Sequence, residues 1–267
     1  INEGLATNVA CVFADVPLRD PNAGAGASMF GARDRSNIAG FQALDLHYSP
    51  MTANGGYAMG ARRHMALYGT KSEQLGQIAV SVRQWAQINP RAAYRTPLTL
   101  DDYNNSRWII EPFHLFDCCM VSNGAVAVIV SAADKAKDMK SSPAYVMAMG
   151  QGYPGNEKRA GDMHDTHTGG RIAAKQVYGQ LGIGPKDIDV RSLYDCYTYT
   201  ILVTLEDYGF CEKGEGGPFV EDGKLGPGGS CPTNTGGGEL SNFYLWGMTP
   251  LSEGCLLYTS PSPRDVE

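Results

Sequence analysis

Apolar and polar residues follow two different periods along this chain, and together they predict a protein that mixes helices with strands. Residues 8–14 and 124–131 are short runs of apolar, largely β-branched side chains, which is typical of buried strands. The run at 124–131 has no polar position before its last residue, so we expect it to be covered on both faces. Shorter runs at 144–149 and 187–194 predict two further strands.

The segment 72–89 shows the period of an amphipathic helix. Leu75, Ile78 and Val82 recur at intervals of three or four residues and therefore share one face, and the pattern stops before a proline. Similar reasoning predicts helices at residues 57–68, 98–107 with Thr99 as the N-cap, 170–181, 198–208, and from Glu239 onward. Because helices and strands alternate, the expected fold belongs to the mixed α/β class.

Composition narrows the possible partners of this chain of 267 residues. The net charge of −6 argues against nucleic acid as the main partner, since phosphate binding needs a basic face. No apolar run reaches the roughly 18 residues that a membrane span requires. The seven cysteines are odd in number and include no CxxC pair, so we expect reduced thiols in a cytoplasmic protein, without a zinc site or a disulfide framework.

Both ends of the sequence look unlike the ends of a domain. The chain starts at Ile1, without an initiating Met, and residues 255–267 turn abruptly rich in Ser and Pro. Those last residues match the translation of a sequencing adapter read in one frame, so we exclude them from the fold as an artefact. We therefore expect a domain that is truncated at both ends, and that is inactive and poorly soluble by itself.

Three short motifs, in order along the chain, carry a family resemblance. The first is FDCC at 116–119 with SNGAVA at 122–127, the second is DIDV at 187–190 with YDCY at 194–197, and the third is NTGGGEL at 234–240. Together they resemble the thiolase superfamily, in the branch of the sterol-carrier-protein and lipid-transfer-type thiolases. Within that branch, Tyr194 and Tyr244 make the chain most similar to the lipid-transfer-type steroid side-chain aldolases. Asn123 stands where that branch usually has Asp.

The resemblance implies a layered α-β-α-β-α fold, of which both ends are missing. Residues 1–17 would end the N-terminal core, 18–118 would form an inserted region that cradles coenzyme A, and 119–140 would return to the N-terminal core through a strand and linker. Residues 141–254 would belong to the C-terminal core. The family's two catalytic cysteines would fall before residue 1 and beyond residue 254. The resemblance also implies a homodimer, joined by a small partner protein with a zinc ribbon and an OB-fold.

Two tyrosines depart from the thiolase pattern. Tyr194 stands where ordinary thiolases have Asn or His, and Tyr244 stands where they have the catalytic histidine. A phenol has a reference pKa of about 10 against about 6.5 for histidine, so forming the base at neutral pH costs about 4 kcal/mol. A phenol can, however, hold or move the proton of a substrate hydroxyl. Either tyrosine alone would favour a packing role, but both fall on catalytic positions.

The tyrosine pair resembles that of aldolases that cleave a β-hydroxyacyl-CoA in the retro-aldol direction. By this resemblance Tyr244 is the expected base, and Tyr194 donates a proton to the enolate or orients the substrate, although the two roles could be exchanged. Asn234 and the N–H groups of Gly236, Gly237 and Gly238 are expected to hold the thioester oxygen. Coenzyme A would enter as part of the substrate, with no tightly bound cofactor.

Other candidate residues favour structural roles. Arg62 and Arg63 could contact the phosphates of coenzyme A, but surface charge on a helix is the more usual role of such residues. His164 and His167 could form a metal pair, yet no further ligand cluster accompanies them, so a solvated loop is favoured. His114 lies between apolar residues and is expected in the core. The glycines at 179–184 follow a helix, which argues against a dinucleotide loop.

Two rival functions stay open at this point. The first is acyl transfer by a β-ketoacyl-CoA thiolase that uses an upstream cysteine, and the second is a subunit that only carries lipid or scaffolds a partner. Cleavage of a hydroxyacyl-CoA without free coenzyme A would favour the aldolase. Tight binding of acyl-CoA without turnover would favour the carrier.

Overall fold

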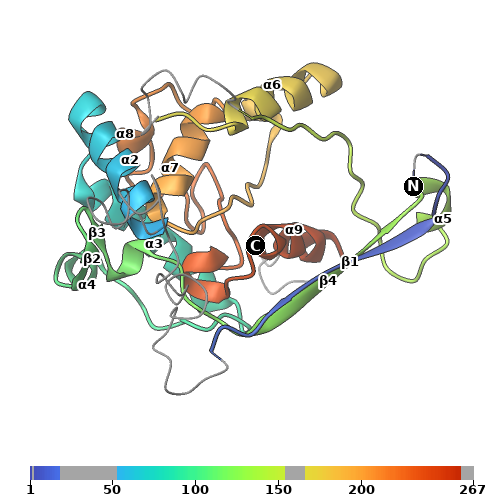
Figure 1. Cartoon of the computed structure of the whole chain (residues 1–267), viewed down its shortest axis with the longest axis horizontal. Coiled ribbons are helices and arrows are strands. Elements are labelled where there is room, and N and C mark those ends of the chain that lie inside the picture. Colours follow the sequence, from blue (N-terminus) through green and yellow to red (C-terminus); the bar gives the residue numbers. More distant parts are fainter. Residues whose placement is uncertain (2, 19–52, 154–165, 260–267) are drawn as a thin grey trace, which may run out of the picture.

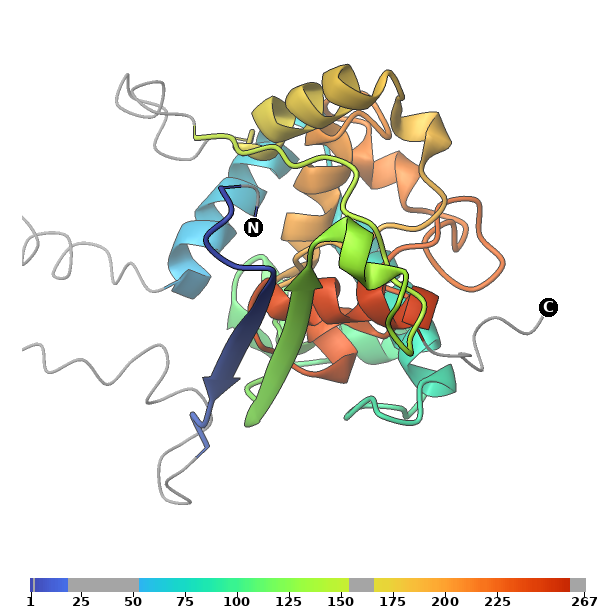
Figure 2. The ribbon, with the colours of Figure 1, turned by 90° about the vertical axis from the view of Figure 1, so that its right-hand side faces the viewer.

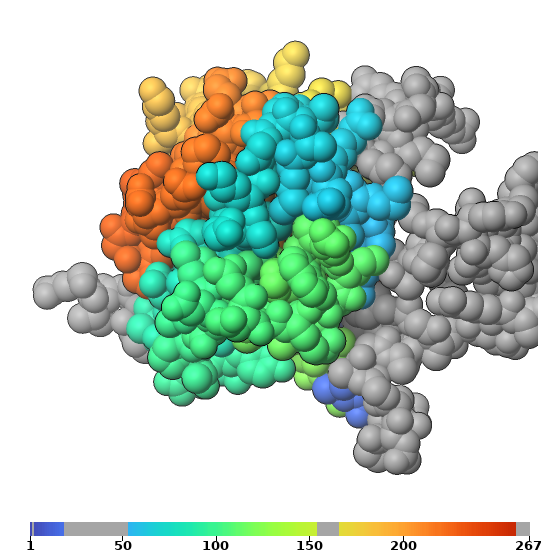
Figure 3. All heavy atoms as spheres, turned by 90° about the vertical axis from the view of Figure 1, so that its left-hand side faces the viewer, coloured from blue at the N-terminus to red at the C-terminus, as the bar shows by residue number. Residues whose placement is uncertain are grey.

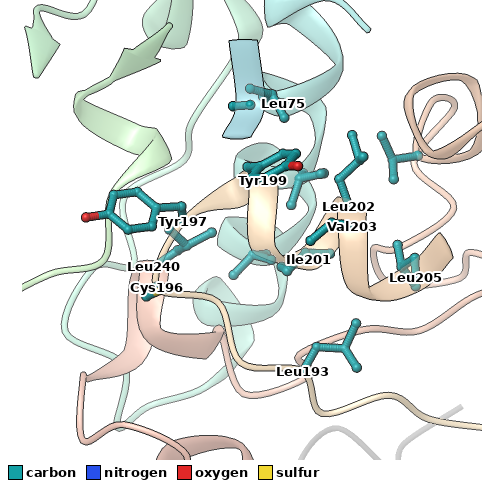
Figure 4. Close-up of a cluster of buried hydrophobic side chains, with 14 of the residues drawn as sticks. Leu75, Leu193, Cys196, Tyr197, Tyr199, Ile201, Leu202, Val203, Leu205 and Leu240 are labelled. Carbon is teal, nitrogen blue, oxygen red and sulfur yellow. The ribbon is translucent and has the colours of Figure 1, made fainter. Parts of the chain in front are cut away.

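The computed structural model describes residues 1, 3–18, 53–153 and 166–259. Its central helix is α3 (Ser72–Ile88), which buries Leu75, Ile78 and Val82 on the predicted face. The helix ends where the sequence predicted, because Pro90 cannot continue it. Helix α7 (Thr198–Asp207) packs against α3 and buries Ile201 completely (Figure 4).

The other elements are shown in Figure 1. They are β1 (Asn8–Asp15), α2 (Ala53–Tyr68), α4 (Leu100–Asn104), β2 (Trp108–Ile110), β3 (Phe113–His114), the 3₁₀ turn η2 (Leu115–Asp117), β4 (Gly124–Ser131), α5 (Ala133–Ala136), α6 (Gly170–Leu181), the 3₁₀ turn η4 (Pro185–Asp187), α8 (Gly216–Phe219), the π-helix η5 (Gly238–Asn242) and α9 (Met248–Thr259). Thr99 caps α4 as predicted, accepting a hydrogen bond from the Asp102 N–H. Helices α2, α3 and α7 share one apolar core, while the predicted domain boundaries stay predictions.

Strands β1 and β4 form an antiparallel ribbon that extends from the helical body (Figure 2). The register runs from Asn8 opposite Ser131 to Asp15 opposite Gly124, so both strand predictions are confirmed. The prediction of burial was wrong for the described residues, since Val12 is 67% exposed. Within the described part of the chain the two strands pair only with each other, and no residue of either strand is buried.

Two other strand predictions were also wrong. Residues 144–149 run without a ladder partner among the described residues. Residues 187–194 begin in the 3₁₀ turn η4 and make one parallel bridge, between Arg191 and Thr233. A run of apolar residues becomes a strand only when a second segment supplies its hydrogen bonds, and that partner is not encoded in the run itself.

Hydrogen bonds of buried polar groups join the first motif to the second. The Asp117 carboxylate accepts hydrogen bonds from the Tyr103 hydroxyl (2.7 Å), the Thr198 hydroxyl and the His114 N–H. Two residues later, the Cys119 N–H donates to the Cys196 carbonyl (2.9 Å). These bonds hold 117–119 beside 196–198, so the ends of the first two motifs lie next to each other. His114 is buried with its Nδ1 2.9 Å from the Ser106 carbonyl, which confirms a core histidine.

Candidate functional site

The structure brings Tyr194 and Tyr244 together, although 50 residues separate them in the chain. Their hydroxyl oxygens lie 2.9 Å apart, and their ring centroids are 6.5 Å apart at an angle of 43°. Tyr244 is 2% exposed and Tyr194 is half-buried. The convergence that a shared chemical role requires is therefore present, while the roles themselves stay predictions.

Local backbone contacts position each ring. The Tyr244 N–H donates to the Ser122 hydroxyl oxygen (2.8 Å), and the same hydroxyl donates to the Tyr244 carbonyl (3.2 Å). Tyr244 is extended just after η5, so the expectation that it lies on a helix was wrong. Tyr194 follows Leu193, and the side-chain amide of Asn234 binds both the N–H and the carbonyl of Leu193.

These two bonds change the expected part of Asn234. Its Oδ1 accepts from the Leu193 N–H (2.7 Å), and its Nδ2 donates to the Leu193 carbonyl (3.0 Å). An amide committed in this way holds the end of the second motif against the glycine loop. It has little capacity left to bind a thioester, so the structure favours a positioning role for Asn234.

The three glycines allow a very close approach of two backbone segments. Gly237 and Gly238 have φ angles of +98° and +56°, which L side chains rarely adopt. This path lets the Glu239 N–H (2.8 Å) and the Leu240 N–H (3.3 Å) donate to the Asp195 carboxylate. The Gly237 N–H donates to the Asn234 carbonyl (2.8 Å), so it is engaged within the loop. Gly236 and Gly238 stay candidates for a thioester contact.

Replacing Gly238 by alanine is expected to destabilise the fold by more than about 1 kcal/mol. A Cβ there would lie 2.0 Å from Asp195 Oδ2, and the positive φ adds strain. Urea unfolding would measure the loss. Gly247→Ala is the control, because a Cβ at Gly247 meets nothing within 4 Å and its φ is not positive. Equal unfolding midpoints for the two variants would contradict this reading of the loop.

Burial determines the protonation of the tyrosine pair. It raises the pKa of Tyr194 above its usual range, and the neighbouring Cys196 and the bond to Tyr244 raise it further. Burial also raises the pKa of Tyr244, but the hydrogen bond from Tyr194 lowers it in part. Both phenols are therefore protonated at neutral pH, and Tyr244 is the one whose anion its neighbour would stabilise.

Three thiols lie in the same region, of which Cys196 is buried and Cys118 and Cys119 are half-buried. Burial raises the pKa of Cys118 and of Cys196 to about 12, and it raises that of Cys119 as well. All seven cysteines are free, and the thiols in this region are protonated and therefore weak nucleophiles at neutral pH. The sequence did not predict this cluster, because Cys119 and Cys196 meet only through the pairing of distant segments.

Two acidic residues beside the tyrosines were also not singled out from the sequence. Burial raises the pKa of Asp195 to about 7, against the opposing effect of the backbone N–H groups that it binds. Burial and the proximity of Asp195 raise the pKa of Glu239 to about 10. For Glu239, the sequence shows only an acidic residue directly after three glycines, and this pattern by itself does not predict burial.

An aromatic wall completes this region. The rings of Tyr57, on α2, and Tyr197 lie 4.7 Å apart, and Tyr197 stacks on Phe113. Tyr57 also interacts with the Cys196 thiol. Figure 3 shows α2 beside the segment that carries β2 and β3 on one face of the molecule. Tyr57 stands in an ordinary helical pattern, so no feature of the sequence predicts its place beside the tyrosine pair.

The other candidate residues lie elsewhere in the structure or engage other partners. Arg62 pairs with Glu111 at 3.4 Å on the surface, and Arg63 is exposed on the same helix. His167 Nδ1 lies 3.1 Å from Asp207, and His164 lies outside the described residues. Within the described ranges, no cluster of three or more His, Cys, Asp or Glu side chains is arranged to hold a metal ion. In the same ranges, no helix is both long and apolar enough for a membrane span.

Comparisons with known proteins give matches over most of the chain. A family model described as "Thiolase C-terminal domain-like" matches residues 156–256. A steroid side-chain-cleaving aldolase of Thermomonospora curvata is 40% identical over 217 residues, covering 78% of this chain and 56% of the relative. A 17-hydroxy-3-oxo-4-pregnene-20-carboxyl-CoA lyase of Mycobacterium tuberculosis is 39% identical over 202 residues, covering 74% and 52%. The chain thus spans about half the length of these relatives.

A solved structure extends the comparison to three dimensions. The structure described as the Ltp2-ChsH2(DUF35) aldolase superposes with a TM-score of 0.82 and 33% sequence identity. The match covers 98% of this chain and 67% of that one. The arrangement of helices and strands described above is therefore shared over nearly the whole chain.

Proposed function

Because the chain belongs to the thiolase superfamily and has its mixed α/β, thiolase-like fold, we propose that its protein cleaves a β-hydroxyacyl-CoA by a retro-aldol reaction. The products are a ketone and a shorter acyl-CoA. One observation carries the proposal: the hydroxyls of buried Tyr244 and half-buried Tyr194 lie 2.9 Å apart. By the family resemblance, both residues stand at positions of acid–base groups. The aldolase and lyase relatives support the same reaction.

The reaction is balanced without an oxidant or a second substrate. The β-hydroxyl loses its proton, its oxygen forms the ketone carbonyl, and the bond between Cα and Cβ breaks. The electron pair of that bond becomes the enolate of the departing thioester, which then takes a proton at Cα. In sum, one proton moves from oxygen to carbon.

A hydrogen-bonded pair of phenols suits this transfer, although neither is ionised at rest. Tyr244 can accept the substrate proton while it passes its own proton to Tyr194, and Tyr194 passes its proton to Cα of the enolate. No isolated phenolate then has to form in the buried site, which the raised pKa values of both tyrosines would disfavour. Tyr194 is the proposed donor toward the enolate.

The binding of the substrate and of partners is part of the proposal. Coenzyme A enters as part of the thioester, and Gly236 and Gly238 stay candidates for contacts to the thioester. Arg62 and Arg63 are surface cations that could meet its phosphates. The name of the solved aldolase joins two proteins, which supports a small partner protein for this one. Assembly as a homodimer in the cytoplasm completes the proposal.

Acyl transfer is the runner-up, because the family model that matches is a thiolase domain. A thiolase would need a nucleophilic cysteine, free coenzyme A and a 3-ketoacyl substrate. The test therefore supplies two substrates to the purified protein: the CoA thioester in the name of the lyase relative, and a 3-ketoacyl-CoA with free coenzyme A.

Ketone and shorter acyl-CoA formed from the first substrate, without free coenzyme A, are the expected result. Coenzyme A-dependent cleavage of the second substrate that survives Tyr244→Phe would instead establish the acyltransferase. Tight binding of both thioesters without turnover would indicate a carrier. Chromatography of the CoA products separates the three outcomes.

A further inference from the structure

We propose that Glu239 is a third catalytic group, a neutral carboxylic acid that donates a hydrogen bond to the thioester carbonyl oxygen. This oxygen becomes the enolate oxygen when the bond between Cα and Cβ breaks. The inference rests on the proposed function and names the group that stabilises the charge developing in it. It also replaces Asn234 and Gly237 in a task for which they have little capacity left.

The side chain of Glu239 is the first observation. It is 0% exposed, and neither of its carboxyl oxygens has a hydrogen-bond partner among the residues that the structure describes. The nearby Thr249 hydroxyl lowers the pKa of this carboxyl. That hydroxyl, however, accepts from the Leu245 N–H (2.9 Å) and gives its one proton to the Phe243 carbonyl (3.3 Å). A buried polar group without a partner costs stability, so its retention calls for an explanation such as a ligand.

The backbone of Glu239 is fixed from two sides. Its N–H donates to Asp195 Oδ1 (2.8 Å), and its carbonyl accepts from the Met120 N–H (3.3 Å). The residue is therefore held between the segments that carry Cys119 and Tyr194. It belongs to η5, a single π-helical turn, and such turns occur frequently at functional sites.

The groups around the carboxyl keep it neutral. The proximity of Asp195 raises the pKa of this carboxyl. The carboxyl in turn raises the pKa of five side chains from α2, the first motif, the second motif and the segment after η5: Tyr57, Cys119, Tyr194, Cys196 and Tyr244. None of these groups is a cation. With a pKa of about 10, the carboxyl keeps its proton at neutral pH.

A neutral acid in a site that excludes water is a strong donor to a developing oxyanion. The proton of Glu239 stays on its oxygen throughout the cycle, while the proton added at Cα comes from the tyrosine pair. The two devices are thus separate: the phenols move a proton, and Glu239 stabilises charge. This division of roles suits a retro-aldol reaction, in which the enolate charge appears on the thioester oxygen.

Kinetics of two variants test the proposal. Glu239→Leu removes the donor, and we expect kcat to fall by about 10²- to 10³-fold. Glu239→Gln keeps an N–H donor of similar shape, and we expect it to recover at least about tenfold of that loss. Thermal unfolding establishes that both variants fold. A folded Glu239→Leu variant with kcat within about threefold of the parent would overturn the proposal.

Infrared spectroscopy provides a readout that does not need turnover. At pH 7.5 we expect a protonated carboxyl band that is absent in Glu239→Gln and retained in the control Glu212→Gln, which alters an exposed carboxyl. The band should shift when acetyl-CoA binds. It should not shift with the S-ethyl thioether of coenzyme A, which lacks the carbonyl. A band indifferent to acetyl-CoA overturns the inference.

The two tests separate this inference from the proposed function. If the parent cleaves no β-hydroxyacyl-CoA but the band shifts with acetyl-CoA, the aldolase proposal fails and the thioester contact of Glu239 is supported. If the parent cleaves the substrate and Glu239→Leu does so equally well, the aldolase proposal is supported and the role of Glu239 is overturned.

Discussion

Replacing Tyr244 by phenylalanine is expected to lower kcat for β-hydroxyacyl-CoA cleavage by about 10²- to 10⁴-fold. The substitution removes the hydroxyl that lies 2.9 Å from that of Tyr194 and keeps the buried ring, whose centroid is 5.9 Å from that of Trp246. The fold loses one hydrogen bond, which costs about 1 kcal/mol. Steady-state kinetics and thermal unfolding, measured on the same preparation, separate the two effects.

Tyr178→Phe is the matched control for this substitution. The hydroxyl of Tyr178, on α6, donates to the carbonyl of Tyr208 at the end of α7 (3.2 Å), so its loss removes one comparable bond away from the tyrosine pair. We expect a similar change in stability and unchanged kcat. Equal activity of the Tyr244→Phe and Tyr178→Phe variants would contradict the assignment of Tyr244.

The two phenols should also behave as a unit. If the proton transfer needs both hydroxyls, Tyr194→Phe alone disables the step, and the double variant is little slower than either single one. A multiplicative loss in the double variant would show that the two tyrosines act independently. In that case the shared relay would be wrong, even with both single variants impaired.

The second large effect is a fall in stability as the pH rises. Burial and Asp195 raise the pKa of Glu239 from 4.5 to about 10. Below 4.5 the carboxyl is protonated in both the folded and unfolded states. Between 4.5 and about 10 only the folded state keeps the proton, so the free energy of unfolding decreases by about 1.4 kcal/mol for each pH unit. Asp195, raised to about 7, acts in the same direction below pH 7.

Urea unfolding at several pH values between 6 and 9 measures this slope. Glu239→Gln carries no titrating group, so its stability relative to the parent should increase with pH by the same amount for each unit. The control Glu212→Gln changes an exposed carboxyl and should keep a constant difference from the parent. Parallel curves for the parent and Glu239→Gln would show that Glu239 is not protonated in the folded protein.

Local patterns explain which parts of the fold the sequence could predict. The face of α3, its end before Pro90 and the cap of α4 at Thr99 depend on residues three or four positions apart, so they can be read from the chain directly. The strands β1 and β4 were predicted because both are continuous apolar runs. The segment 144–149 is also apolar but has no ladder partner among the described residues. The segment 187–194 mixes apolar with polar residues and makes only one bridge.

The candidate site divides in the same way. Motif spacing was sufficient to single out Tyr194 and Tyr244, because their positions in the family pattern are a property of sequence. The commitments of Asn234 and Gly237 were not predictable, because they depend on which neighbours the folded loop offers. From the sequence, Glu239 is only the expected start of a helix within the third motif, since nothing in its sequence context indicates burial.

The sequence by itself determined the family, the main helices and the pair of tyrosines, because each follows from residue type and spacing. Only the tertiary structure decided that the two hydroxyls meet. In the described part of the chain, it also decided that the ribbon of β1 and β4 stays exposed and that the carboxyl of Glu239 is buried without a hydrogen-bond partner. Those facts depend on contacts between residues far apart in the chain. Burial in turn decides which acids keep their protons, so the chemistry of the site follows from packing.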